Sequence, residues 1–182
     1  MNDSERAAQV EYLPDGAVDA RDDAALRNLF VESFSKSAHN EVFRTQRFFR
    51  ESPAHRWIIR DAEGTIVAHV ACHEKVVETS TGELPIAGVA EVATHSAWRR
   101  RGLALLALTA LHEWARERFE FALLFGVNPI YDKLGYASLE RPLGLLGLDD
   151  GIWRIERRPI RVLSFQGRDF PEGLIDLRCP LF

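Results

Sequence analysis

The chain has 182 residues, of which 46% are hydrophobic and 27% are charged, and its formal net charge at pH 7 is −4. This length and composition predict one soluble globular domain, residues 1–182, whose core needs neither metals nor disulfides. The acidic balance argues against a general nucleic-acid binder, because such domains usually carry a basic face.

Cysteine content and terminal composition predict the compartment. Cys72 and Cys179 are the only cysteines, too few for a disulfide framework, which favours a reducing interior. Residues 1–8 lack the apolar core of a secretory signal, and no run approaches the ~20 apolar residues of a membrane span. We therefore expect a cytoplasmic protein with no membrane contact.

The first half of the chain predicts strands and helices that alternate with turns. Residues 9–13 form a strand candidate, and Asp19 or Asp22 is expected to cap a helix whose apolar residues have helical spacing. These apolar residues are Leu26, Leu29, Phe30 and Phe34. A second helix is expected at 41–50. Two strands should follow at 55–60 and 65–78, joined by a turn at 61–64, and a further turn is expected at 79–82.

The second half predicts a strand–helix–strand unit. The expected elements are a strand at 86–95, a helix at about 102–118, a strand at 121–127, a short helix at 130–134 closed by Gly135, strands at 136–148 and 161–165, and a loop at 168–173 that leads to residues 175–177. Antiparallel strands followed by this unit predict a mixed α/β sheet. A ligand then favours the carboxyl ends of strands where neighbours separate, which corresponds to residues 95–104.

A basic turn lies between the predicted strand and the long helix. Arg99, Arg100, Arg101 and Gly102 occupy this turn. Cations at a helix N-terminus are unfavourable, by roughly 0.3–1 kcal/mol each, unless an anion binds there. Free backbone N–H groups at the helix start would point at the same anion. The turn therefore predicts a phosphate cradle, although the chain contains neither a P-loop nor a G-x-G-x-x-G fingerprint.

Two motifs resemble those of a known superfamily. Arg99-x-x-Gly102-x-Ala104, placed after an apolar strand, resembles the acetyl-CoA signature of the GNAT superfamily of N-acetyltransferases. Tyr131-Asp132-Lys133-Leu134-Gly135-Tyr136 is similar to the family's later tyrosine run, although the connection before it is shorter than in the commoner pattern. The resemblance implies a GNAT-like central sheet, mixed and largely antiparallel, flanked by helices.

The resemblance also implies roles for particular residues. The CoA pyrophosphate would bind the backbone of the basic turn and helix start, and the pantetheine arm would pair with the strand before it. The cofactor-binding residues are then Val92, Ala93, Thr94, Arg99, Arg100, Arg101, Gly102, Leu103 and Ala104. Tyr131 would be the general acid that protonates the departing thiolate.

Deprotonation of an ammonium substrate needs a base or a water chain. Glu91 is a carboxylate in an otherwise apolar strand, where an unpaired charge is costly, and is the first candidate for that base or for a residue that holds the water. His69, His73 and His95 are weaker alternatives. The surroundings of the two cysteines do not suggest a covalent intermediate, and no cluster has metal-ligand spacing, so we expect direct transfer without a metal.

The sequence predicts an N-acetyltransferase that moves an acetyl group from acetyl-CoA to a primary amine, expected to be a small molecule. The cofactor core would span residues 84–136, and residues 19–50 with the C-terminal tail would form the acceptor side. Two alternatives are open: a non-catalytic acyl-CoA-binding sensor, and a nucleic-acid or protein-interaction domain that uses the basic turn. A homodimer through the apolar run 143–148 is a further hypothesis.

Overall fold

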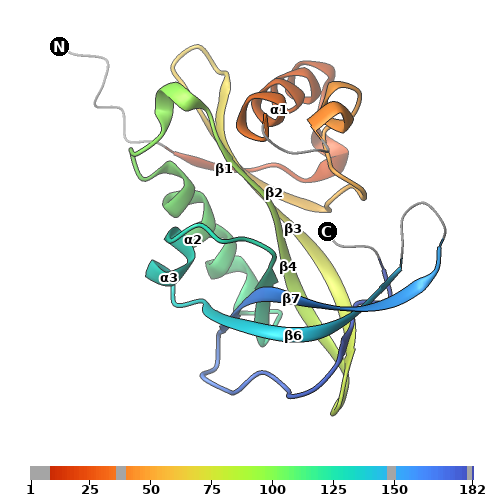
Figure 1. Cartoon of the computed structure of the whole chain (residues 1–182). Coiled ribbons are helices and arrows are strands. Elements are labelled where there is room, and N and C mark those ends of the chain that lie inside the picture. Colours follow the sequence, from red (N-terminus) through yellow and green to blue (C-terminus); the bar gives the residue numbers. More distant parts are fainter. Residues whose placement is uncertain (1–8, 36–39, 147–150, 180–181) are drawn as a thin grey trace. The chain divides into compact units, whose positions relative to one another are not determined.

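The computed structural model describes residues 9–35, 40–146, 151–179 and 182. The chain forms two compact units (Figure 1). The first unit comprises Met1–Ala71 and Glu91–Leu111, and the second comprises Cys72–Ala90 and His112–Phe182. Strands β3 (Ile66–Thr79) and β4 (Gly82–Thr94) and helix α2 (Leu103–Ala115) contribute residues to both. That residues 1–182 form one domain stays a prediction.

In the first unit the strand order is β1-β2-β3-β4. Its remaining elements are β1 (Val10–Tyr12), the 3-10 helix η2 (Asp15–Ala17), α1 (Ala20–Ser33), the 3-10 helix η3 (Asn40–Arg44), β2 (His55–Arg60) and the 3-10 helix η4 (Ser96–Trp98). β1 and β2 are antiparallel, with Val10 opposite Ile59. The predicted turn at 61–64 is confirmed, and the Asp61 carboxylate stabilises it by accepting from the N–H groups of Glu63 and Thr65.

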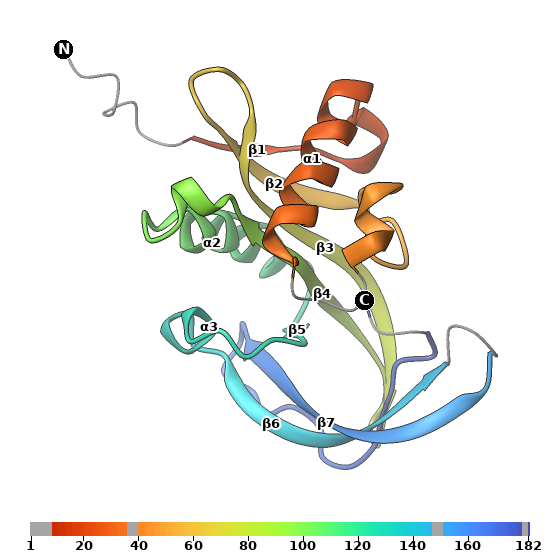
Figure 2. The same cartoon turned by 45° about the horizontal axis from the view of Figure 1, so that its top comes forward.

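Helix α1 begins where the sequence predicts. Of the two possible caps, Asp19 is the one used, because its carboxylate accepts from the Asp22 N–H at 2.8 Å. Leu26, Leu29 and Phe30 face the core of the first unit, and burial of each side chain contributes roughly 1.5–3 kcal/mol. Figure 2 shows α1 and η3 lying over β2 and β3, which supply Ile58 and Ile66 to that core.

The predicted helix at 41–50 is wrong beyond Arg44. Only η3 forms, and the chain from 45 to 50 is irregular. The Gln46 side chain donates to the carbonyl oxygens of Phe48 and Phe49, at 2.9 and 3.1 Å. The Phe49 N–H donates to Glu91, and Arg47 binds two carboxylates. These tertiary bonds occupy groups that a continuous helix would use internally, so they override the apolar spacing.

The second unit contains the strands β5 (Phe121–Leu124), β6 (Ala137–Leu146), β7 (Trp153–Ser164) and β8 (Ile175–Asp176), and the short helix α3 (Ile130–Lys133). β4 and β5 are parallel, with Ile86 opposite Phe121, and β7 runs antiparallel to both β5 and β6. β8 pairs parallel with β6 and antiparallel with β3. The predicted mixed, largely antiparallel sheet is therefore confirmed.

Two strand boundaries in the second unit differ from the sequence prediction. β5 ends at Leu124 rather than 127, because its pairing with β4 stops at Val89 opposite Leu124. β7 begins at Trp153, eight residues earlier than the predicted start at 161, because β6 pairs with it along its whole length (Figure 1). Most side chains from 153 to 159 are exposed, so this stretch lacks a hydrophobic signal. Residues 147–148 of the predicted strand lie outside the described residues.

Candidate active site

The turn that precedes α2 is built by residues of the first unit. The Glu32 carboxylate of α1 accepts from the Ser96 N–H at 2.8 Å and pairs with His95 Nε2 at 3.0 Å. His95 Nδ1 accepts in turn from the Ala97 N–H at 3.3 Å, which caps η4. His95 is thus engaged as a structural cap at the entrance to the basic turn.

The basic turn itself has the backbone of an anion cradle. Arg100 and Gly102 both have positive φ angles, 63° and 78°. For Arg100 this left-handed conformation costs roughly 1–3 kcal/mol. Alternation of ordinary and left-handed residues turns successive N–H groups toward one concavity, and this arrangement binds phosphates. No heavy atom lies within 4 Å of a Cβ built at Gly102, among the residues described, so the cradle is open on that side.

The arginine side chains of this turn are partly held in place. Arg101 stacks on the Trp98 ring, with its guanidinium carbon 4.6 Å from the ring centroid. Arg99 Nε donates to the Thr94 carbonyl at 3.2 Å. Helix α2 follows directly, and the Leu106 N–H bonds to the Gly102 carbonyl, so the N–H groups of residues 103–105 point out of the helix start. The turn therefore combines backbone donors, a helix dipole and fixed positive charge.

The residues predicted to pair with pantetheine form the end of β4. The Ala93 side chain is buried in the core of the first unit, whereas Val92 and Thr94 are partly exposed. Leu103 is buried at the first position of α2, and Ala104 beside it is partly exposed. The structure thus brings Glu91, residues 92–94 and residues 99–104 into one unit. Their predicted roles toward the cofactor stay predictions.

Glu91 occupies a strained and secluded position. Its φ is 50°, which interrupts the extended conformation of β4. Its Oε1 accepts from the Phe49 N–H at 2.7 Å, and its Oε2 is buried without a hydrogen-bond partner among the described residues. Burial raises the pKa of Glu91 to about 7, against the lowering effect of the Phe49 hydrogen bond and of Arg56. A carboxyl group with a pKa near the working pH suits a general base.

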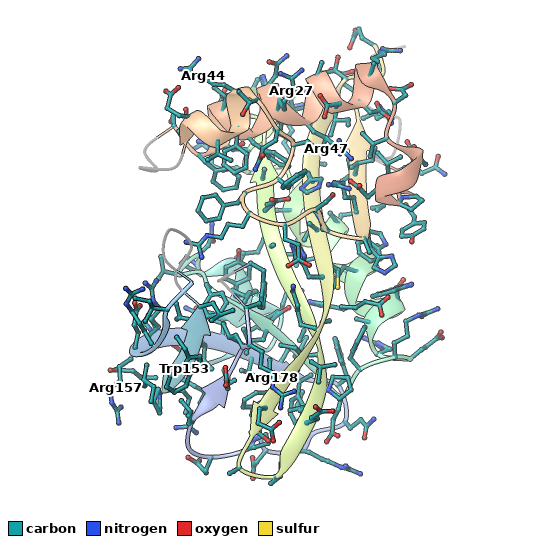
Figure 3. All side chains as sticks on the ribbon, turned by 90° about the vertical axis from the view of Figure 1, so that its right-hand side faces the viewer. Arg27, Arg44, Arg47, Trp153, Arg157 and Arg178 are labelled. Atoms are coloured by element: carbon teal, nitrogen blue, oxygen red, sulfur yellow. The ribbon has the colours of Figure 1, made fainter. Side chains whose placement is uncertain are left out.

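Sequence reasoning missed the charged groups that surround Glu91. Arg56 on β2 is completely buried, and its Nη1 donates to Asp15 Oδ1 at 2.6 Å. Arg47, labelled in Figure 3, binds both oxygens of the same Asp15 carboxylate and also Asp23. The sequence held one signal, an arginine beside the apolar run of β2. This signal is weak because arginines in strands are usually exposed.

The other two histidine candidates are buried. His69 Nδ1 lies 2.8 Å from the carbonyl oxygen of Glu91, and burial, reinforced by the charge of Arg56, lowers the pKa of His69 to about 3. His69 is therefore neutral at physiological pH. His73, in the second unit, packs against the Phe182 ring.

Tyr131 lies in α3, within the second unit. Its ring is buried and packs edge-to-face on Tyr136, with the centroids 5.8 Å apart. The ring also packs closely on Gly126, where an added Cβ would lie 2.8 Å from a ring carbon. Arg161 reinforces this turn by donating to the Gly126 carbonyl and to Asp132. Burial raises the pKa of Tyr131, and the Arg161 charge opposes that effect, so the hydroxyl is protonated and able to donate.

The described ranges hold neither a metal-binding cluster nor a helix suited to span a membrane. In residues 9–35, 40–146, 151–179 and 182, no group of three or more His, Cys, Asp or Glu side chains is placed to hold a metal ion. Over the same residues, no helix has the length and apolar character that a membrane span requires.

Comparison with known proteins identifies the family. The model of the acetyltransferase (GNAT) domain matches residues 19–139. A GNAT family N-acetyltransferase from Escherichia coli, solved with CoA, superposes with a TM-score of 0.63 at 16% identity, over 96% of this chain and 92% of that one. A GNAT family acetyltransferase from Brucella melitensis, solved with acetyl-CoA, gives 0.61 at 15% identity, over 92% and 95%.

At these identities the structural likeness shows the fold alone, and no curated protein sequence matches the chain. The family model, however, covers well over half of the 182 residues and includes both motifs quoted above. The mixed sheet and its helices agree with the fold of the solved relatives. The chain belongs to the GNAT family of acetyltransferases.

Proposed function

We propose that this acetyltransferase moves the acetyl group of acetyl-CoA to the primary amine of a small molecule by direct transfer. The observation that carries the proposal is the basic turn, in which Arg100 and Gly102 take left-handed backbone conformations at the start of α2. A non-glycine residue is rarely held in that conformation without a functional reason. Open backbone donors beside three arginines suit a pyrophosphate.

The proposed reaction uses Glu91 as its general base and Tyr131 as its general acid. Glu91 accepts a proton from the ammonium group of the acceptor, directly or through water, which frees the nitrogen lone pair. The nitrogen attacks the thioester carbonyl carbon, a C–N bond forms, and the C–S bond of the tetrahedral intermediate breaks. Tyr131 donates its hydroxyl proton to the departing thiolate. The extra proton that the nitrogen carries after the attack passes through solvent to the Tyr131 phenolate, so the products are a neutral amide and free CoA.

The relatives supply further support for the cofactor. One solved relative holds CoA and another holds acetyl-CoA, and both share the fold of this chain. The acceptor side of the proposal, residues 19–50 with the C-terminal tail, has no such support. A cytoplasmic location and a homodimer are further parts of the hypothesis. The interface suggested at 143–148 would not use Leu143 and Leu145, because both are buried in the core of the second unit.

The proposal is tested by release of free CoA thiol from acetyl-CoA with a panel of small primary amines. We expect Tyr131→Phe to lower kcat by about 100-fold with little change in KM, because only the proton donor is lost. Tyr12→Phe is the matched control, since that hydroxyl is exposed and binds His55. Binding of acetyl-CoA without thiol release for any amine would favour the non-catalytic sensor instead.

A further inference from the structure

Arg56 is a buried cation that the proposed reaction does not use. Its side chain is fully inaccessible, although it lies near the start of β2. Nη1 donates to Asp15 at 2.6 Å and to the Pro53 carbonyl at 3.4 Å. Nε and Nη2 are buried and have no hydrogen-bond partner in the part of the chain that the structure describes. Burying a guanidinium with unpaired donors is costly, and a hydrophobic residue would usually serve stability better.

Two buried acceptors complement these donors. Glu91 Oε2 has no partner among the described residues, and the same holds for His69 Nε2. Because His69 Nδ1 faces the Glu91 carbonyl at 2.8 Å, Nδ1 must carry the ring proton, which leaves Nε2 as an acceptor. Arg56, His69 and Glu91 come from β2, β3 and β4, which are consecutive strands of the first unit. The charge of Arg56 acts on both His69 and Glu91, although no hydrogen bond joins its buried Nε and Nη2 to either residue.

Arg56 favours the ionised form of Glu91, whereas burial and the charge of Asp15 oppose it. Arg56 from β2 and Asp15 from η2 act on the Glu91 carboxyl group, and the neutral His69 from β3 contacts the Glu91 backbone carbonyl. Asp15 repels the Glu91 carboxylate, but Arg47 also binds Asp15 and offsets its charge. The Phe49 N–H supplies one further favourable bond. Arg56 is thus the cation that opposes the desolvation of Glu91.

We propose that Arg56 is a positioning residue whose positive charge favours ionisation of the buried Glu91 carboxyl group, so that Glu91 can accept the proton of the acceptor amine. The Asp15 carboxylate holds Arg56 in place through its bond to Nη1. This inference rests on the proposed role of Glu91 as the base.

The test is a carbon-13 NMR titration of the Glu91 carboxyl group in the protein without substrate, assigned by its loss in Glu91→Gln. We expect Arg56→Gln to raise the pKa of Glu91 by about one unit or more, the size of effect an adjacent opposite charge has. Arg56→Lys retains the charge and should leave that pKa within about half a unit of wild type. Arg60→Gln is the matched control, because Arg60 lies on the same strand but pairs with Asp22 and Glu11.

With an amine that the enzyme acetylates, kcat/KM should fall on the acid side of its pH profile with an apparent pKa. In Arg56→Gln this apparent pKa should shift by the same amount as the pKa from the NMR titration. An unchanged Glu91 titration in that variant would overturn the inference, and so would a shifted titration with an unmoved apparent pKa of kcat/KM. If Arg56→Gln does not fold, Arg56→Lys decides: a shift of about one unit with the charge retained contradicts the electrostatic role. A shifted titration with no turnover of any amine would refute the proposed function and the base role, while the coupling between Arg56 and Glu91 stands.

Discussion

Glu91→Gln should make the protein more stable at alkaline pH. Glutamine retains an oxygen that can accept from the Phe49 N–H but lacks the charge that burial disfavours. The pKa of Glu91 is raised from 4.5 to about 7 in the folded protein. At about 1.36 kcal/mol per pH unit, this difference corresponds to ~3 kcal/mol of stability.

The sign of the effect follows from proton binding. Between pH 4.5 and about 7, the folded protein keeps a proton on Glu91 that the unfolded chain has released. The free energy of unfolding of the wild type therefore falls as pH rises through this window, and the loss is complete above it. Glutamine does not titrate, so the advantage of Glu91→Gln over wild type should grow by ~3 kcal/mol between pH 4.5 and 8, or about 6–12 °C in Tm for a chain of this size.

The assay is urea or thermal unfolding of both proteins at pH 4.5, 6 and 8. The control is Glu140→Gln, an exposed carboxylate on β6, which should change stability by less than about 0.5 kcal/mol at every pH. Taking the difference between variant and wild type cancels the titration of every other group. A difference that is constant from pH 4.5 to 8 would refute the reasoning, because it would mean that Glu91 ionises normally in the folded protein.

Three further predictions concern neighbouring groups. Asp15→Asn should lower the free energy of unfolding by about 3 kcal/mol or more in urea titrations, because it leaves the buried Arg56 without its carboxylate. An effect no larger than that of Asp169→Asn, at an exposed carboxylate, would contradict this. Gly126→Ala should lower the free energy of unfolding by about 1–3 kcal/mol and should also lower kcat, because the added Cβ would displace the Tyr131 ring. Gly16→Ala is the control and should change neither quantity, because the space around Gly16 is open. The kcat/KM of the wild type should fall as pH drops below about 7, because Glu91 becomes protonated and cannot act as the base. The residual activity of Glu91→Gln should not show this fall, and a fall that remains in the variant would belong to another group.

The sequence predicted those elements whose signal is local. The Asp19 cap, the turn at 61–64 and both motifs depend on a few adjacent residues, and all lie in the structure where the pattern indicates. The basic turn could be recognised because three arginines at a helix start conflict with the helix dipole. Local conflicts of this kind are expected at functional or strained sites.

The features that the sequence did not predict depend on contacts between residues that are distant in sequence. The segment 45–50 is irregular because Glu91 and Asp15 bind its backbone and side chains, and no spacing within the segment reveals that. Likewise, the burial of Arg56 is set by η2 and β4, so its sequence neighbours could not predict it. The sequence therefore predicted that an unpaired Glu91 carboxylate inside an apolar strand is costly. It did not predict the Phe49 N–H and Arg56, the groups that stabilise that carboxylate.

The central claim, that the basic turn binds acetyl-CoA, is tested most directly by calorimetric titration of the protein with acetyl-CoA. Gly102→Glu places bulk and negative charge in the turn, and Gly167→Glu is the matched control, because its φ of 72° and open surroundings resemble those of Gly102 at 78°. We predict micromolar binding by the wild type and the control, and binding at least about tenfold weaker, ~1.4 kcal/mol, by Gly102→Glu. Absence of binding by the folded wild type, or equal binding by both variants, would contradict the account.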